Sequence, residues 1–339
     1  MTTGFTVLKG GLLTTVQDAG RPGFQGQGIP AGGAMDLRAF RLANLLLGNP
    51  VDEAALEMTL LGPELEFTSP TYVAVTGGDF TPRLNGEPVP MYAALRVRKG
   101  DVLSFGGART GTRGYVAFAG LLDVPPVLGS RSTALLPGLG GYKGRKLQPG
   151  DRLEERADPK RLHGLRSRRL PPPDYDRDDG VLRVVLGPQD RLFTRRGLET
   201  FLNEEYTVTG QSDRMGMRLD GPAIEARGTT DILSDGTAPG AVQVPTGGKP
   251  IVLLSDRQTT GGYAKIAVVA TVDIPRLVQA RMGRKIRFRA VSVQEARQLL
   301  LQEARELERL RERFRATRRL FFTPCPPGRE REERKGERA

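Results

Sequence analysis

The sequence is poor in the residues that enzymes most often use for acid–base and metal chemistry. Its 339 residues include one histidine, His163, one cysteine, Cys325, and no tryptophan. One cysteine excludes an internal disulfide bond, and one cysteine with one histidine excludes a zinc site built from these two residue types. The lone histidine lies in an arginine-rich segment, which argues against a Ser-His-Asp triad. Any chemistry must therefore come from carboxylates, arginine or lysine, amides, hydroxyls and backbone N–H groups.

Long apolar runs are also missing. No stretch approaches the roughly 18 residues that a membrane-spanning helix needs, and the first residues, MTTGFTVLKGG, lack the basic and apolar parts of a signal peptide. The P-loop motif is absent, and the glycine-rich segment 138–146 does not match the dinucleotide-binding fingerprint. Together with the single cysteine, these absences predict a cytoplasmic protein.

Positive charge is abundant, with 51 Lys and Arg residues against 39 Asp and Glu residues and a formal net charge of +12. The basic runs fall in two peripheral places, residues 160–173 and the tail after Glu312, and neither interleaves aromatic side chains. Proteins that bind single-stranded nucleic acid combine basic grooves with stacking aromatics. We therefore interpret the charge as a solvated, arginine-rich surface and expect neither nucleic acid nor a membrane as partner.

What the chain has in quantity is glycine and proline, 43 and 25 residues, spread between short apolar runs. This distribution of glycine and proline is typical of many short strands joined by turns. Strands are predicted near 64–68, 72–78, 94–106 and 114–120, and again near 181–188, 206–209, 241–244, 251–254, 264–270 and 284–292. The two groups of strands indicate two related barrels.

Three helices are predicted. Asp36 as N-cap, apolar residues at helical spacing and Gly48 as terminator define the first. A short helix is expected near 195–202. The capping box Ser292-x-x-Glu295 begins a third helix, whose apolar stripe is expected to pack on the body or, alternatively, on a partner.

The predicted domain organisation has five parts. They are an N-terminal β-barrel domain (1–155), a charged proline-rich linker (156–180), a C-terminal β-barrel domain (181–291), a C-terminal helix (292–316) and a disordered tail (317–339).

Four polar segments are candidates for a binding site, although each also fits a plain structural turn. They are residues 14–36, 76–80, 209–222 and 253–263. The last, LLSDRQTTGGY, is the strongest candidate for a binding loop. Its two glycines let the backbone approach a ligand closely, and Arg257 with the nearby Lys265 can neutralise an anion.

Four longer motifs resemble the biotin-dependent carboxyltransferase-like family over about residues 5–290. They are TTVQDAGRPGFQGQGIPAGGAMD, RLANLLLGNP, QSDRMGMRLDGP and DGTAPGAVQVPTGGKPIVLLSDRQTTGGYAKIA. The family includes the C subunit of 5-oxoprolinase and the carboxyltransferase domain of urea amidolyase. The resemblance implies a mainly β fold class with two cyclophilin-like β-barrel domains, short helices and a C-terminal helix. Arg284 and Lys285 depart from the family at a turn where an acidic residue is more usual.

The resemblance also implies a function. A protein of this kind is expected to act with the B subunit of 5-oxoprolinase, activating 5-oxo-L-proline with ATP and Mg²⁺ for ring opening to L-glutamate, while the separate A subunit finishes hydrolysis. One alternative is carboxyl transfer from carboxybiotin to a urea or amide acceptor, with biotin as cofactor. Another is a non-catalytic regulatory partner of a kinase inhibitor protein.

Site residues are predicted on this basis, and no metal held by the protein alone is expected. Catalytic roles are assigned to Asp18, Asp213, Arg257 and Gln258. Substrate binding is assigned to Gln17, Arg21, Asp79, Ser212, Arg214, Thr259, Thr260, Gly261, Tyr263 and Lys265. In this hypothesis Arg257 or Lys265 holds a carboxylate or phosphate, and residues 258–260 bond the lactam. Asp18 or Asp213 orients the lactam N–H or a magnesium ion. Segments from both halves must then meet in a shared cleft.

Overall fold

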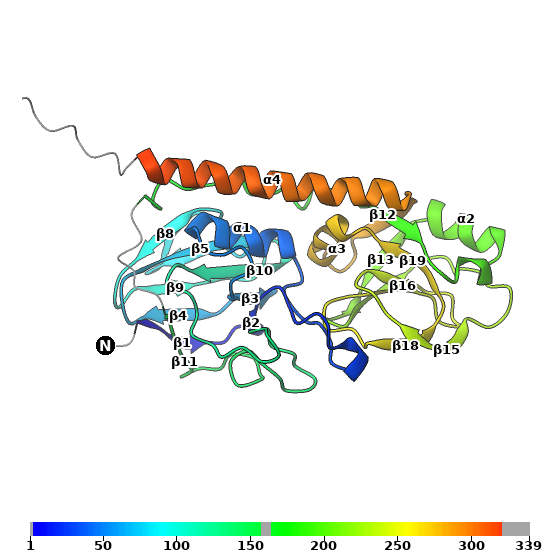
Figure 1. Cartoon of the computed structure of the whole chain (residues 1–339), viewed down its shortest axis with the longest axis horizontal. Coiled ribbons are helices and arrows are strands. Elements are labelled where there is room, and N and C mark those ends of the chain that lie inside the picture. The colour runs from blue at the N-terminus through cyan, green and yellow to red at the C-terminus, as the bar shows by residue number, and fades with distance from the viewer. Residues whose placement is uncertain (1–2, 157–163, 321–339) are drawn as a thin grey trace, which may run out of the picture.

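The structure, a computed structural model, describes residues 3–156 and 164–320 (Figure 1). Two strand-rich halves lie end to end, and one long helix, α4 (Val293–Leu320), runs along both of them (Figure 1). The prediction of a mainly β fold class with a C-terminal helix is confirmed.

The first half consists of two antiparallel sheets around one apolar core. One sheet contains β1 (Gly4–Lys9), β4 (Glu64–Phe67), β6 (Arg83–Leu84), β7 (Glu87–Pro88), β9 (Val102–Ser104) and β11 (Arg152–Glu154), in the order β11-β1-β4-β9-β6-β7. The other contains β2 (Leu13–Gln17), β3 (Ala55–Thr59), β5 (Thr71–Asp79), β8 (Ala94–Val97) and β10 (Thr110–Phe118), in the order β2-β3-β10-β5-β8. Phe5 of one sheet stacks on Phe118 of the other, with ring centroids 4.7 Å apart. Apolar residues that alternate along these strands hold the two sheets together.

Helix α1 (Leu37–Leu47) covers β5 and β10 of the second sheet. The Asp36 carboxylate accepts a hydrogen bond from the Ala39 N–H at 2.8 Å, and Gly48 ends the helix at φ +72°. The left-handed conformation at Gly48 favours glycine because it has no Cβ. Both predicted ends of this helix are confirmed.

The second half is a closed barrel. Its strands are β12 (Val181–Leu186), β13 (Tyr206–Ser212), β14 (Gly216–Asp220), β16 (Ala241–Gln243), β17 (Ile251–Leu253), β19 (Lys265–Val269) and β20 (Lys285–Ala290), in the order β12-β19-β16-β17-β14-β13-β20. The parallel pair β12–β20 closes the ring. Helix α2 (Arg195–Asn203) contributes Phe201, which stacks on Phe288 of β20 with ring centroids 4.5 Å apart.

A two-stranded ribbon lies outside the ladder of this barrel. It pairs β15 (Asp231–Gly236) with β18 (Thr260–Tyr263). The interpretation of 253–263 as a loop is therefore wrong for its last four residues. Threonine and tyrosine fit a pleated strand well. Their backbone pairs with β15, an earlier segment of the chain, and the spacing of residues in the sequence does not reveal that pairing. The remaining short elements are η1 (Gln25–Gln27), η3 (Asp190–Leu192), η4 (Thr271–Asp273) and α3 (Ile274–Gln279).

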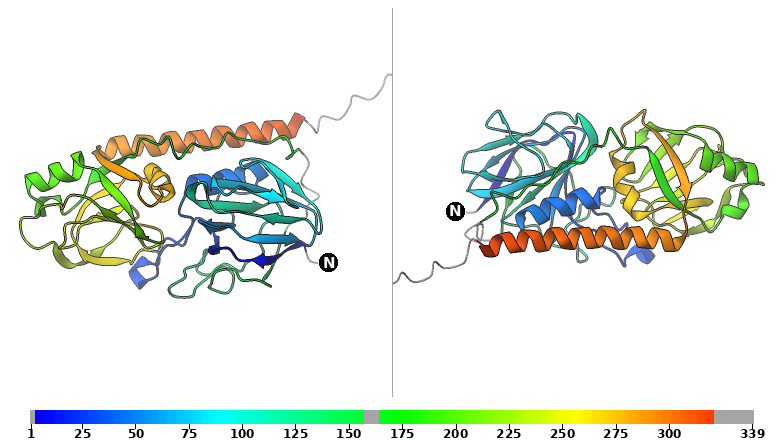
Figure 2. Two further views of the ribbon diagram at one scale, coloured as in Figure 1. Left: turned by 180° about the vertical axis from the view of Figure 1, so that it is seen from behind. Right: turned by 90° about the horizontal axis from the view of Figure 1, so that it is seen from above.

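Helix α4 packs on the body, as predicted. The Ser292 hydroxyl accepts a hydrogen bond from the Glu295 N–H at 3.1 Å, and Phe314 near the other end is buried. Arg38 of α1 forms ion pairs with Glu303 at 3.2 Å and Glu306 at 3.0 Å. Figure 2 shows the helix spanning both halves. It continues to Leu320, so the prediction of disorder is wrong for residues 317–320, and residues 321–339 lie outside the described residues.

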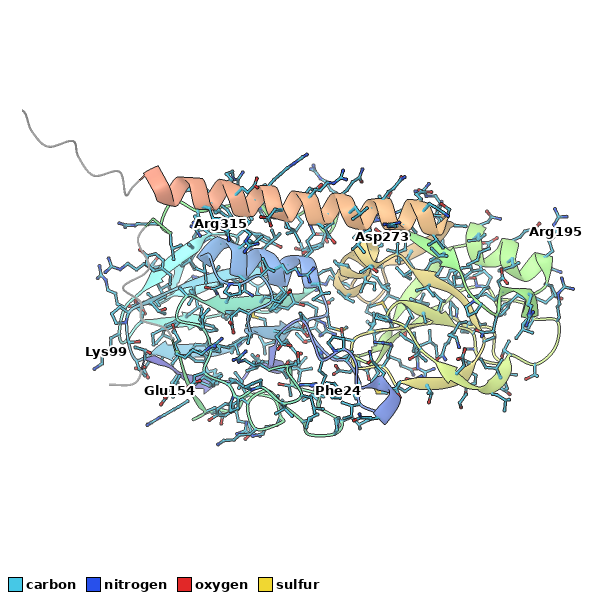
Figure 3. The ribbon with its side chains drawn as sticks, viewed as in Figure 1. Phe24, Lys99, Glu154, Arg195, Asp273 and Arg315 are labelled. Atoms are coloured by element: carbon cyan, nitrogen blue, oxygen red, sulfur yellow. The ribbon has the colours of Figure 1, made fainter. Side chains whose placement is uncertain are left out.

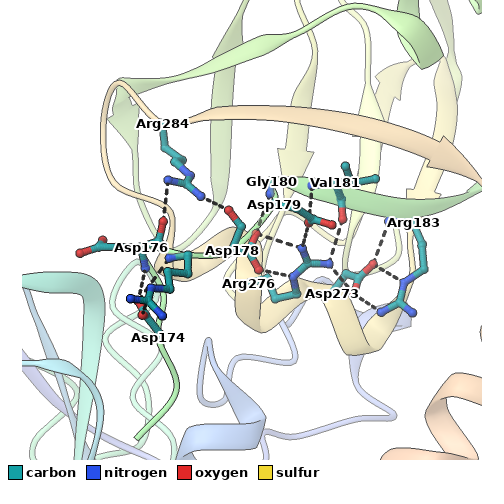
Figure 4. Close-up of polar contacts among 11 residues, drawn as sticks. Asp174, Asp176, Asp178, Asp179, Gly180, Val181, Arg183, Asp273, Arg276 and Arg284 are labelled. Atoms are coloured by element: carbon teal, nitrogen blue, oxygen red, sulfur yellow. Dashed lines mark hydrogen bonds and ion pairs between the residues drawn. The ribbon is translucent and has the colours of Figure 1, made fainter.

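The described part of the predicted linker is fixed to both halves. Leu165 and Arg168 are buried, and the Tyr175 hydroxyl donates to Asp36 at 3.3 Å. On the barrel side, Arg276 of α3 pairs with Asp178 and Asp179, each at 2.5 Å (Figure 4). Residues 157–163 lie outside the described residues. The division into two domains and a linker stays a prediction.

Arg284 is one of the two basic residues that depart from the family pattern. It also contacts the segment that leads into the barrel. Its guanidinium donates to the backbone carbonyl groups of Asp176 and Asp178 (Figure 4). An acidic side chain offers no such donor to a carbonyl group. The arginine thus helps to fix the segment that leads into β12.

Candidate functional site

Three of the four predicted polar segments meet between the two halves. The Gly32 N–H donates to the Ser255 carbonyl at 3.1 Å, and the Asp256 N–H donates to the Arg214 carbonyl at 2.8 Å. Met35 belongs to the barrel core, so the long N-terminal segment reaches into the second half. Phe24 of this segment lies where the two halves meet, on the side away from α4 (Figure 3).

Arg214 forms the centre of this contact. Its guanidinium bonds both oxygens of Asp256 at 2.8 and 2.9 Å, the carbonyl of Gly33 at 2.8 Å, and the carboxylate of Glu57. Burial alone would lower the pKa of Arg214, but the charges of Glu57 and Asp256 outweigh this effect and raise the pKa. Because its donors are used internally, the arrangement suits a clamp between the halves better than a free substrate-binding group.

Glu57 of β3 is the acid partner on the first half. One of its carboxylate oxygens receives the Arg214 bond, and the other accepts from the Met35 N–H and the Tyr115 hydroxyl, both at 2.8 Å. Burial first, and then the charge of Glu57, raises the pKa of Tyr115 well above its usual range. Tyr115 therefore acts as a neutral donor at physiological pH.

Asp18 and Gln17 are buried and engaged by neighbouring loops. The Asp18 carboxylate accepts from the hydroxyls of Ser130 and Ser132, both at 2.6 Å, and from the Arg131 N–H at 2.5 Å. The Gln17 amide donates to Thr133 O at 3.1 Å. These bonds tie the N-terminal segment to residues 130–133.

Arg21 is a buried cation without an ion pair in the described part of the chain. Nη2 donates to the Ser132 carbonyl and Nε donates to the Val127 carbonyl at 3.4 Å, while Nη1 finds no partner among the described residues. Burial lowers the pKa of Arg21, against the opposing charges of Asp18 and Asp256. Arg21 therefore keeps one donor group, Nη1, without an acceptor among the described residues.

Arg257 is a second buried cation of this kind. It is 5% exposed and donates only to the carbonyls of Thr237 and Leu254, each at 3.4 Å, with no carboxylate within ion-pair distance among the described residues. Burial lowers its pKa. A buried guanidinium of this type gains strongly from an anionic ligand.

Amide groups lie next to Arg257. The Gln258 amide donates to Oε1 of Gln243 at 3.5 Å, and Gln243 itself is 2% exposed. A Cβ added at Gly261 would lie 2.5 Å from Gln243 Nε2, so the ribbon strand β18 rests on this amide. The arrangement offers a cation and two amides under the β15–β18 ribbon.

Lys265 ties the ribbon to the barrel. Its ammonium group, 5% exposed, pairs with Asp235 at 3.1 Å, and its backbone N–H donates to the Gln189 side chain at 3.2 Å. The hydrogen bond from Lys265 is the main cause that lowers the pKa of Asp235. Lys265 therefore already has an acid partner, unlike Arg257.

Asp79 lies away from the other predicted site residues. It borders an open groove of about 650 Å³ on the first half, together with Arg83, Arg109 and residues 172–174. Its carboxylate accepts from the Thr81 N–H at 2.9 Å, as expected of a turn. The structure does not bring it to Arg257.

The remaining predicted residues serve turns or the ribbon. Asp213 is exposed and accepts from the N–H groups of Met215 and Gly216 at 2.7 and 3.1 Å, and the Ser212 hydroxyl donates to Thr209 O. The carbonyl of Thr259 accepts from Thr237, and Thr260, Gly261 and Tyr263 lie in β18. The catalytic role of Asp213 and the assignment of the other residues to substrate binding stay predictions.

Comparison with known proteins decides the family. A model of the carboxyltransferase domain, subdomains A and B, matches residues 27–290. The chain belongs to this carboxyltransferase domain family. It is 38% identical to the 5-oxoprolinase C subunit of Escherichia coli (strain K12), over 90% of this chain and 96% of that protein. The corresponding values for the 5-oxoprolinase C subunit of Haemophilus influenzae are 39%, 88% and 94%.

Solved structures of the carboxyltransferase family include the same fold within longer chains. The urea amidolyase of Kluyveromyces lactis superposes with a TM-score of 0.82 at 33% identity, over 91% of this chain. This chain spans only 20% of that urea amidolyase. The family resemblance derived from the four sequence motifs is confirmed.

Two important residues of this carboxyltransferase-family site were missed by the sequence analysis. Glu57 lies in the strand run ALEMT and Gln243 in AVQ, each a single polar residue in a short apolar strand. The sequence signal that could have found them is a single polar residue within a short apolar strand. Such a residue is buried with the strand, and a buried polar group requires a hydrogen-bond partner.

Two further properties bear on the chemistry. Within residues 3–156 and 164–320, no group of three or more His, Cys, Asp or Glu side chains is placed to hold a metal ion. None of the helices in the same ranges is long and apolar enough to cross a membrane.

Proposed function

We propose that this protein is the C subunit of an ATP-dependent 5-oxoprolinase. It acts with a B subunit to activate 5-oxo-L-proline with ATP, an A subunit takes part in hydrolysis, and the product is L-glutamate. We also propose that it works in the cytoplasm, where ATP is available.

One observation carries the proposal. The 5-oxoprolinase C subunits of two bacteria are 38% and 39% identical to this chain over the aligned residues, and the matches extend over 96% and 94% of those proteins. A match that covers most of this chain and nearly all of the relative supports the same role in an assembly. It does so more strongly than the match to urea amidolyase, of which this chain covers a fifth.

The chemistry of the Arg257 region is consistent with this substrate. 5-Oxoproline carries a carboxylate and a ring amide. Arg257 supplies a buried cation, Gln243 a buried amide and Gln258 an exposed amide. A carboxylate bound by a buried guanidinium gains a charge-assisted hydrogen bond. Arg257 would orient the ligand through its carboxylate.

ATP is treated as a co-substrate. An unstrained amide opens slowly, and phosphoryl transfer to the amide oxygen provides a better leaving group, which mainly requires positioning and charge neutralisation. The described residues contain no cluster of metal-ligating side chains, so Mg²⁺ enters the proposal only as the ion that accompanies ATP.

The decisive experiment is reconstitution. Glutamate release from 5-oxo-L-proline and ATP is measured with this chain and with its A and B subunits, and each component is omitted in turn. We expect glutamate only from the complete mixture. An undiminished rate without this chain, or no glutamate from the complete mixture, rejects the proposal.

Carboxyl transfer from carboxybiotin is the second candidate, favoured by the carboxyltransferase family match and by the urea amidolyase fold. It requires a biotin carrier and a biotin carboxylase from other chains. The same reconstitution separates the two candidates, because inhibition by avidin and dependence on bicarbonate belong only to the biotin route.

A further inference from the structure

Gln243 is a buried amide whose hydrogen bonds are incomplete. It ends β16, is 2% exposed, and its Nε2 has no partner among the described residues. Within the described part of the chain, its Oε1 accepts only from Gln258 Nε2, at 3.5 Å, the outer limit of a hydrogen bond. Buried polar groups are almost always paired, because leaving one unpaired costs about 1–3 kcal/mol. An amide kept in this state indicates a partner that arrives from outside.

The backbone of Gly261 lies against the Gln243 amide, and a larger residue there would crowd it. A Cβ at Gly261 would lie 2.5 Å from Gln243 Nε2 and 3.3 Å from Cγ2 of Thr237. The carbonyl of Thr237 in turn accepts from Arg257 at 3.4 Å. Thr237 and Gly261 thus place the Gln243 amide and Arg257, which has no acid partner among the described residues, in one neighbourhood under the ribbon.

We infer that Gln243 recognises the substrate by pairing with its ring amide, an inference that rests on the proposed 5-oxoprolinase function. A lactam is an amide locked in the cis form, so its N–H and C=O point to the same side. A glutamine carboxamide likewise presents C=O and N–H side by side. The two groups form a cyclic pair with two hydrogen bonds, which an open-chain trans amide and a carboxylate cannot form.

Either orientation of the Gln243 amide offers one donor and one acceptor, and the position of its oxygen fixes where the ring N–H lies. In 5-oxoproline the carboxylate is attached to the carbon next to the ring nitrogen. The group that binds the ring amide and the cation that binds the carboxylate must therefore lie close together. Gln243 and Arg257 meet that requirement through Thr237 and Gln258.

Binding to the chain in complex with its B subunit, measured by calorimetry, tests the inference. The probes are 5-oxo-L-proline and its N-methyl derivative, which lacks the N–H donor. We expect the native complex to bind the N-methyl probe about 10- to 100-fold more weakly, as loss of a buried hydrogen-bonded pair implies. In Gln243→Leu, affinity for 5-oxoproline falls by a similar factor and the two probes bind within about threefold of each other. Gln298→Leu, exposed on α4, is the control and keeps the native discrimination.

A second pair of variants avoids any change to Gln243. Gly261→Ala places a methyl group against its amide and is expected to weaken 5-oxoproline binding about tenfold or more. Gly262→Ala, whose added Cβ meets nothing closer than 3.4 Å, should bind as the native protein does. This pair decides the question even where Gln243→Leu does not fold.

The possible results separate the inference from the proposed function. Native discrimination between the probes in Gln243→Leu, equal binding of both probes by the native complex, or no binding of either, overturns the role of Gln243. Absence of glutamate formation by the native complete mixture overturns the proposed function, whatever the probes show.

Discussion

At the residue scale, buried arginines differ in what they can do according to how many acid partners surround them. Arg214 has two carboxylates and a carbonyl, which use most of its five donors. Arg257 has two long bonds to carbonyls and no acid partner among the described residues. The first arrangement stabilises the fold, whereas the second leaves charge available for a ligand.

Replacing Arg257 should therefore damage function more than stability. In Arg257→Ala we expect 5-oxoproline-dependent turnover by the complete complex to fall about 10- to 100-fold, since a charge-assisted hydrogen bond contributes about 1.5–3 kcal/mol. The free energy of unfolding should change little, because no ion pair is broken. Arg195→Ala, on the exposed face of α2, is the matched control. Native turnover in Arg257→Ala would reject the role.

Glu155 should make stability depend on pH. Burial raises its pKa to about 7 from 4.5, although the hydroxyl of Thr71 donates to it at 2.8 Å. Because the folded state prefers the protonated form, this group contributes stability that is full below about pH 4.5 and is lost as pH rises through 7. The loss amounts to at most about 3 kcal/mol.

Glu155→Gln should reduce that loss. We expect the variant to be more stable than the native protein at pH 8 and to differ little from it at pH 4.5, measured as the free energy of urea unfolding. A variant with the same dependence on pH as the native protein would show that Glu155 does not carry it.

At the scale of the element, local signals set the helices and long-range pairing sets the strands. The ends of α1 follow from Asp36 and Gly48 alone, because capping involves neighbouring residues. The strand β18 exists because β15 pairs with it, and the ribbon then covers Gln243. A loop interpretation of residues 260–263 could not anticipate that pairing.

Gly48→Ala tests the end of α1. The residue has φ +72°, and an added Cβ would lie 3.0 Å from Nη1 of Arg168. Strain and crowding together should lower the unfolding free energy by about 1–3 kcal/mol. Gly150→Ala, with φ +88° and nothing within 4 Å of its Cβ, shares the strain alone and should cost less. Equal costs would show that the Arg168 contact contributes nothing.

At the scale of the whole molecule, polar contacts hold the two halves together. Arg214 of the barrel bonds Glu57 of the first half, and Gln279 of α3 donates to Asp36 at 2.8 Å and to Arg113 O at 3.0 Å. Helix α4 and residues 164–180 add further bridges (Figure 2). The positions of the site segments therefore depend on this interface.

A double-mutant cycle on Arg214 and Glu57 measures that dependence. Arg214→Met leaves a buried carboxylate without its cation and should cost about 3–5 kcal/mol of unfolding free energy, and Glu57→Gln should also destabilise. The double variant should cost clearly less than the sum, because the two side chains interact directly. Additive costs would contradict a direct coupling.

The sequence by itself determined the fold class, the family, the capped helices and four candidate polar segments, because motifs, caps and strand periodicity are local. The tertiary structure decided which three of these segments meet. It did not determine which polar residue has an acid partner. The sequence presents Asp18, Arg214 and Arg257 equally as site residues. In the fold, Asp18 and Arg214 have internal partners, whereas Arg257 has no carboxylate partner among the described residues. Only the tertiary structure brought Glu57 to Arg214 and β18 over Gln243, since both contacts join residues far apart in the chain.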